Sequence, residues 1–115
     1  MPDFTKLKES PLKDKYFYRV ASWIVLDTKY ICITDPNSPR VITMDAWPQL
    51  VFLEADGRRT VEEFIHWMAK QYSRVPDKLD ETILFEIEQL VSEGLLKISD
   101  KSVELDPDFV GPIKR

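Results

Sequence analysis

The chain has 115 residues, a net charge of −4 and a single cysteine, with 43% hydrophobic and 31% charged residues. This length suits one domain with one modest core, and the composition is typical of a folded globular protein. The lone Cys32 excludes an intramolecular disulfide and fits a reducing compartment. The chain shows neither an apolar run long enough to span a membrane nor an apolar N-terminal signal, so we expect a cytoplasmic protein that does not bind membranes.

The acidic balance of the chain disfavours nucleic-acid partners. A sequence pI of about 5.0 means that the protein as a whole repels phosphate backbones, although it leaves room for a local basic patch. The longest predicted helix, from about Asp77 to Glu93, carries six carboxylates against one lysine, Lys78. A helix that enters a DNA groove needs the opposite charge, so we expect no nucleic-acid ligand.

Residues suited to catalysis or to metal binding are scarce. His66 is the only histidine, which excludes a histidine-based catalytic triad or a multi-histidine metal site within one chain. The three glycines, Gly57, Gly94 and Gly111, are not clustered, so the chain has no glycine-rich phosphate loop. We therefore expect a binding protein that is not an enzyme and that has no metal and no other cofactor.

The two ends of the chain have the composition of peripheral segments. Residues 1–15 are polar and lysine-rich and contain prolines at positions 2 and 11, which predicts a flexible N-terminal arm or a short segment that contacts a partner. From Asp106 onward the sequence no longer suggests regular structure, so residues 106–115 are predicted to be a C-terminal tail. Residues 16–105 remain as the single folded domain.

Three short strands are predicted in the first half of the domain. Segments 22–27, 29–34 and 40–44 are rich in β-branched and aromatic residues, and turn-forming residues separate them at 27–29 and 35–39. Short connections of this kind predict an antiparallel meander. Residues 16–20 either add a further strand or extend the first.

Three helices are predicted next, over about 46–55, 61–72 and 77–93. Asp45 is a good N-cap for the first, and Pro48 falls in its first turn, where a missing N–H costs little. The third helix is opened by Pro76 or capped by Asp80. Beyond it, residues 95–98 and 103–105 are predicted to pair as a hairpin around the turn at 99–102.

The boundaries of these helices have specific signals. Gly57 is predicted to stop the first helix, because glycine adopts left-handed backbone angles at little cost. Thr60 and Glu63 have the spacing of a capping box at the start of the second. Gly94 is predicted to end the third. The order of elements indicates an α+β winged-helix fold, with a three-stranded antiparallel sheet followed by a three-helix bundle and a short C-terminal hairpin.

These features together resemble the PqqD family, within the wider group of RiPP recognition elements. The resemblance covers roughly residues 20–98. It is carried by the three strands and three helices, by Asp56-Gly57-Arg58-Arg59-Thr60-Val61 and by Gly94-Leu95-Leu96. It implies a protein that binds the leader region of a ribosomally synthesised precursor peptide and presents it to a modifying enzyme, often a radical SAM maturase.

The resemblance also implies a location for the site. The leader would add as a strand to the third β-strand, here Arg40–Met44, and its side chains would enter a groove along the third helix. The residues so implied are Arg40, Val41, Ile42 and Thr43 on the strand, and Leu84, Ile87, Glu88 and Val91 on the helix. The apolar positions of that helix span an unusually wide arc. This width indicates a second apolar contact, with the N-terminal sheet or with a ligand, unless the whole arc packs inside the protein.

Two other functions remain open on the sequence alone. One is a winged-helix regulator that binds DNA, which the acidic third helix disfavours. The other is a degenerate domain that keeps the fold for protein interactions while its strand edge is blocked. The sequence does not determine the precursor peptide, the partner enzyme or the oligomeric state.

Overall fold

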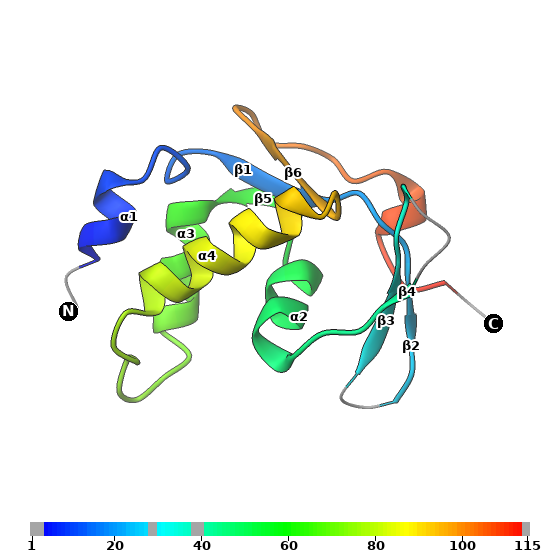
Figure 1. Cartoon of the computed structure of the whole chain (residues 1–115). Coiled ribbons are helices and arrows are strands. Elements are labelled where there is room, and N and C mark those ends of the chain that lie inside the picture. Colours follow the sequence, from blue (N-terminus) through cyan, green and yellow to red (C-terminus); the bar gives the residue numbers. More distant parts are fainter. Residues whose placement is uncertain (1–3, 28–29, 38–40, 114–115) are drawn as a thin grey trace.

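Two small antiparallel sheets and a group of helices make up the protein (Figure 1). The computed structural model describes residues 4–27, 30–37 and 41–113. Within these residues the helices are α1 (Thr5–Glu9), α2 (Ala46–Leu53), α3 (Val61–Ala69) and α4 (Leu79–Ser92), with a short 3-10 helix at Pro107–Phe109. The strands are β1 (Tyr16–Arg19), β2 (Trp23–Val25), β3 (Ile31–Thr34), β4 (Val41–Ile42), β5 (Asp56–Thr60) and β6 (Leu96–Ser99). The α+β class is therefore confirmed.

The sheet in the order β2-β3-β4 is the predicted meander. Both of its strand pairs are antiparallel, and Ile33 lies opposite Trp23 on one side and Ile42 on the other. Ile31 and Ile33 alternate with less buried neighbours, so one face of β3 packs into the core. Residues 28–29 and 38–40 lie outside the described residues.

A second sheet has the order β5-β1-β6 and differs from the prediction. Residues 16–19 form its central strand, which pairs with β6 in a continuous antiparallel register. The predicted C-terminal hairpin is wrong, because residues 96–99 pair with β1 and not with residues 103–105. Val103 instead donates its N–H to the Gly57 carbonyl at 2.8 Å, beside β5. Strand β1 pairs with β6 at all four of its positions, and this pairing leaves residues 103–105 without a place beside β6.

The predicted start of the second helix is confirmed. The N–H of Glu63 donates to Thr60 Oγ1 at 3.1 Å, and the N–H of Thr60 donates to Glu63 Oε1 at 2.9 Å. Gly57 has the positive φ of 77° that its prediction required, but it lies within β5 rather than at a helix end. The segment Asp56–Thr60 is thus a strand and not merely a tight turn.

The predicted end of the third helix is also confirmed. The N–H of Leu95 donates to the Leu90 carbonyl and the N–H of Gly94 to the Val91 carbonyl, both at 3.0 Å. These two bonds, with φ of 79° at Gly94, form a Schellman motif. At its start, α4 is preceded by Lys78 in a left-handed conformation, so neither Pro76 nor Asp80 acts as the N-cap.

The N-terminal segment is folded onto the domain, which corrects the prediction of a flexible arm for its described part. Leu7 in α1 is fully buried and Phe4 is nearly so. The N–H of Leu7 donates to Asp80 Oδ2 of α4 at 3.1 Å. Helix α1 therefore covers one side of α4, at the end of the molecule remote from sheet β2-β3-β4 (Figure 1).

Helix α4 is the centre of the core. It contacts α1, α2, α3 and β6, and its side chains at Ile83, Ile87 and Leu90 are buried among them. This arrangement explains the wide apolar arc, because the helix is covered on several sides. No helix in the described ranges is long and apolar enough to cross a membrane.

Candidate functional site

Strand β4 lies at one edge of its sheet, and the hydrogen bonds of β3 show which of its backbone groups point outward. The N–H of Thr34 donates to the Ser22 carbonyl at 2.8 Å, so Thr34 faces β2. In an antiparallel pair successive residues face opposite sides, so Ile33 faces β4, where Ile42 is its partner. Val41, opposite Thr34, therefore directs its N–H and C=O away from the sheet. These two groups are positioned to pair with a further strand.

The open edge is short. The N–H of Ile31 faces the same side as that of Ile33, but it lies beyond the end of β4 and donates to Gln49 Oε1 of α2 at 3.0 Å. The part of this edge available to a partner therefore begins at β4 and runs toward Thr43, which is exposed. A bound strand of only a few residues would match it.

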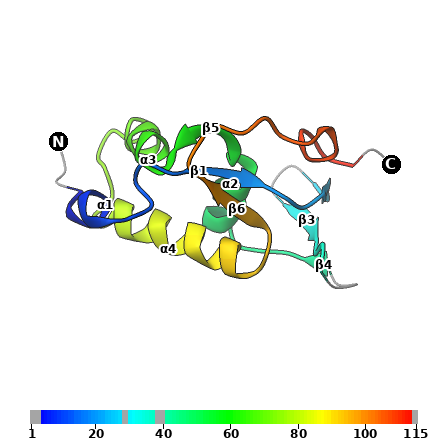
Figure 2. The same cartoon turned by 90° about the horizontal axis from the view of Figure 1, so that it is seen from above.

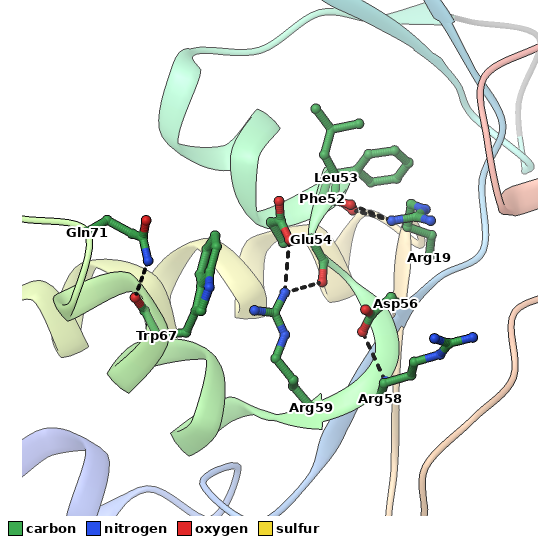
Figure 3. A network of polar contacts seen from close by, with 9 residues as sticks. All are labelled: Arg19, Phe52, Leu53, Glu54, Asp56, Arg58, Arg59, Trp67 and Gln71. Carbon is green, nitrogen blue, oxygen red and sulfur yellow. Dashed lines mark hydrogen bonds and ion pairs between the residues drawn. The ribbon is translucent and has the colours of Figure 1, made fainter.

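The opposite edge of the sheet is occupied by the C-terminal segment. The N–H of Ile113 donates to the Trp23 carbonyl of β2 at 2.7 Å. Arg19 holds the same segment, because its Nε donates to the Phe109 carbonyl at 3.0 Å while its Nη1 donates to the Leu53 carbonyl at 2.6 Å. The contact between Arg19 and the end of α2 is drawn in Figure 3. The two edges of this sheet therefore differ, and the β4 edge is the more accessible.

Arg19 is itself largely enclosed. Burial lowers the pKa of its guanidinium from the ordinary value, and the nearby carboxylates of Asp56 and Glu54 oppose this shift. The guanidinium group also lies over the aromatic ring of Trp23, with its central carbon 4.9 Å from the ring centroid. The side chain thus connects β1, α2, β2 and the C-terminal segment. This role is structural.

A groove of about 270 Å³ separates the β4 edge from α4. One wall is the chain from β4 to the start of α2, and the other is one face of α4. The lining residues are Ile42, Thr43, Met44 and Pro48 on the first wall, and Phe85, Glu86, Gln89, Leu90 and Glu93 on the second. Figure 2 shows β4 on the side of its sheet toward α4. A strand added to β4 would place alternate side chains near this groove.

The lining of the groove combines apolar side chains with two glutamates. Glu86 and Glu93 both line it, and none of the described lining residues is a lysine or an arginine. Partial burial raises the pKa of the Glu86 carboxyl, and the nearby Asp45 carboxylate raises it further. Within the described residues, Glu86 has no ion pair. The negative charge at this site is thus held in an unfavourable environment.

Of the strand residues implied by the resemblance, Ile42 and Thr43 line the groove, whereas none of the four implied helix residues lines it. Val41 and Ile42 form β4, and Thr43 lines the groove. Arg40 lies outside the described residues. On α4, Ile87 is fully buried in the core and cannot contact a peptide there, so its assignment to the groove is wrong.

The other three helix residues face different surfaces. Leu84 and Glu88 line a separate groove of about 360 Å³ beside α1, and Leu84 is almost completely buried. Val91 lines a hollow of about 410 Å³ with Pro36 and Asn37 of the β3–β4 connection. The residues implied by the resemblance thus lie on the helix that lines this groove, but on faces directed toward the core, toward α1 and toward the β3–β4 connection.

The residues that sequence reasoning missed are Phe85, Glu86, Gln89 and Glu93. They share one face of α4, at spacings of one, three and four residues. Phe85 carried the signal that could have identified this face, because it stands out among polar neighbours in the helical pattern. In the structure it is 56% exposed.

The motif around Arg59 serves the fold rather than the groove. Arg59 Nη2 donates to Glu54 Oε2 at 2.9 Å, and its guanidinium carbon lies 4.7 Å from the Trp67 ring centroid (Figure 3). Arg58 is exposed, and its N–H donates to Asp56 Oδ1. The described residues also contain no cluster of three or more side chains that could hold a metal ion.

Comparison of the chain with protein-family models, with curated proteins and with solved structures gave no match.

Proposed function

We propose that the protein binds an extended peptide segment as an added strand on β4, with peptide side chains entering the groove against α4. The observation that carries this proposal is the outward-facing backbone of Val41, which directly precedes the groove residues Ile42 and Thr43. Backbone hydrogen bonds would supply affinity independent of sequence, and the apolar lining would select side chains. Because the chain resembles the PqqD family, the proposed ligand is the leader of a precursor peptide, presented to a modifying enzyme such as a radical SAM maturase.

The order of elements supports a winged-helix relationship. Helices α2, α3 and α4 follow one another, with β5 between the first two and β6 after the third. In this proposal the missing C-terminal hairpin is replaced by β1, which takes the central place between β5 and β6. The meander β2-β3-β4 is then the part that receives the peptide.

Two valines provide a matched test of strand addition. Val41 on β4 and Val25 on β2 are exposed and lie on opposite edges of the same sheet. Val25 is opposite Ile31, so its N–H also points outward. Proline removes this donor without breaking a bond to β3. Peptides selected from a random display library on the immobilised protein should lose binding to Val41→Pro and retain binding to Val25→Pro, as measured by fluorescence anisotropy.

The same experiment can also contradict strand addition on β4. If Val41→Pro is folded by circular dichroism and binds the selected peptides as well as the unchanged protein does, the peptide does not add to β4. Nanomolar, salt-sensitive binding of a defined DNA duplex in a gel-shift assay would support a nucleic-acid function instead.

A further inference from the structure

We infer that the peptide bound at this groove is cationic, with lysine or arginine residues beside an apolar residue that packs on Phe85. This inference rests on the proposed function and specifies the chemistry of its ligand.

The charge of the groove is of one sign. Glu86 and Glu93 are on the same wall, and Asp45 is close enough to Glu86 to disfavour its charged form. A peptide strand placed between this wall and β4 would bring its side chains near both glutamates. Lysine or arginine at those positions would be attracted, whereas aspartate or glutamate would be repelled.

The placement of these acids also disfavours the free helix. The C-terminal end of a helix carries a partial negative charge, which favours basic residues there. Helix α4 has no basic residue in its last turn, and Glu93 is its C-cap. An acidic groove wall at this end lowers stability in the absence of a ligand. Such a departure from favourable local electrostatics is typical of a binding surface.

Phe85 lies where two acidic grooves meet. It lines the groove beside β4 and also the groove beside α1. The second groove contains Glu9, Glu81 and Glu88 against one lysine, Lys6. A peptide that continues past β4 would therefore cross an exposed aromatic ring between two sets of carboxylates. An aromatic face of this kind accepts either an apolar side chain or a cation.

The test is to select peptides from an unbiased display library on the immobilised protein at low salt and to sequence those retained. Lysine and arginine should be enriched beside an apolar residue. For a synthesised member of the selected set, Glu86→Gln and Glu93→Gln should each weaken binding by about two- to fivefold, as expected for an ion pair that stays accessible to water. Phe85→Ala should weaken peptide binding more than either glutamate variant does. The matched control is Glu104→Gln, an exposed glutamate outside both grooves, which should leave the affinity unchanged.

Charge reversal separates this inference from the proposed function. Glu86→Lys should reduce binding of the cationic peptide and improve binding of a variant peptide in which lysine is replaced by glutamate. If the selected peptides depend on Val41 but are neutral or acidic and tolerate Glu86→Gln and Glu93→Gln, the cationic ligand is wrong while strand addition stands. If the selected peptides are insensitive to Val41→Pro, the proposed function itself fails.

Discussion

The backbone N–H of Leu7 in α1 donates a hydrogen bond to Asp80 Oδ2 in α4 at 3.1 Å, although the two residues are 73 positions apart in the chain. Leu7 is the third residue of α1, where backbone N–H groups have no partner within the helix. The buried carboxylate of Asp80 thus caps α1 from outside. This bond, together with the burial of Phe4 and Leu7, fixes the N-terminal segment against α4.

Asp80→Ala should destabilise the protein by about 1–3 kcal/mol, because it leaves the Leu7 N–H buried without its acceptor. Urea unfolding followed by tryptophan fluorescence would measure this difference. Hydrogen exchange at the Leu7 amide should become faster in the same variant. Glu81→Ala, at the neighbouring and more exposed carboxylate, is the control and should have little effect. Equal stability of the Asp80 and Glu81 variants would contradict the capping role.

The sequence predicted those elements whose signals are local. Thr60 and Glu63, three residues apart, cap the start of α3. Gly94 ends α4 through backbone hydrogen bonds that reach back no further than five residues. The meander was predicted because its turns and its alternating residues lie within one continuous segment. Each of these features depends on residues that are near one another in the chain.

The features that sequence missed depend on distant contacts. The hairpin at 95–105 failed because β6 finds its partner in β1, some 80 residues earlier. Helix α1 is too short for its periodicity to be recognised, and it forms because Leu7 is buried against α4. The groove face of α4 was misplaced for the same reason. Helix α1 lies against the face that contains Leu84, whereas Phe85 on the neighbouring face stays more than half exposed.

Glycine at position 57 is required by both its backbone and its surroundings. Its φ is 77°, and a Cβ there would overlap the Val103 carbonyl. Gly57→Ala should therefore destabilise the protein. The loss should exceed the roughly 1–2 kcal/mol that a left-handed backbone conformation alone costs a residue with a Cβ. Gly111→Ala is the matched control, because a Cβ at that position meets no atom within 4 Å. Thermal unfolding of both variants would test this, and similar melting temperatures would show that β5 adjusts to the added methyl group.

Core and groove on α4 can be distinguished by three truncations. Leu84→Ala and Leu90→Ala should each destabilise by about 2–5 kcal/mol, because both side chains are buried. Phe85→Ala should change stability little, because its ring is more than half exposed. Its effect should appear in peptide affinity instead. A large loss of stability in Phe85→Ala, measured by urea unfolding, would mean that the ring packs in solution and is not a free groove residue.

The C-terminal segment should protect the β2 edge. Removal of residues 107–115 takes away the carbonyl acceptors that Arg19 finds at Phe109 and Val110. It also uncovers the Trp23 carbonyl. The truncated protein should lose about 1–3 kcal/mol of stability from the poorly paired guanidinium and should associate at high concentration through the exposed edge.

A point variant isolates the edge effect. Ile113→Pro removes only the donor to the Trp23 carbonyl and leaves the Arg19 contacts in place. It should associate less than the truncated protein and remain closer to the unchanged protein in stability. Light scattering coupled to size-exclusion chromatography would measure the association of both variants, and urea unfolding would measure their stability. A truncated protein that stays monomeric at high concentration would show that the β2 edge does not associate when the C-terminal segment is absent.

Glu86→Gln should stabilise the free protein at neutral pH. The folded-state pKa of Glu86 is raised by burial and by Asp45, so the folded protein holds this proton more tightly than the unfolded chain does. The unfolding free energy then falls as the pH rises from the ordinary value of 4.5 through the raised folded-state pKa, and it stays lower at neutral pH. Glutamine has no such penalty, so the advantage of Glu86→Gln should be present at pH 7 and should vanish below the ordinary pKa.

The comparison that checks this prediction is urea unfolding of the two proteins across that pH range. Glu104→Gln, at an exposed glutamate outside the groove, should show no pH-dependent gain. A glutamate that lowers stability but strengthens the binding of a cationic peptide serves the ligand rather than the fold. If Glu86→Gln is instead less stable than the unchanged protein at pH 7, the carboxylate has a stabilising partner in solution, and its role in the groove would be structural.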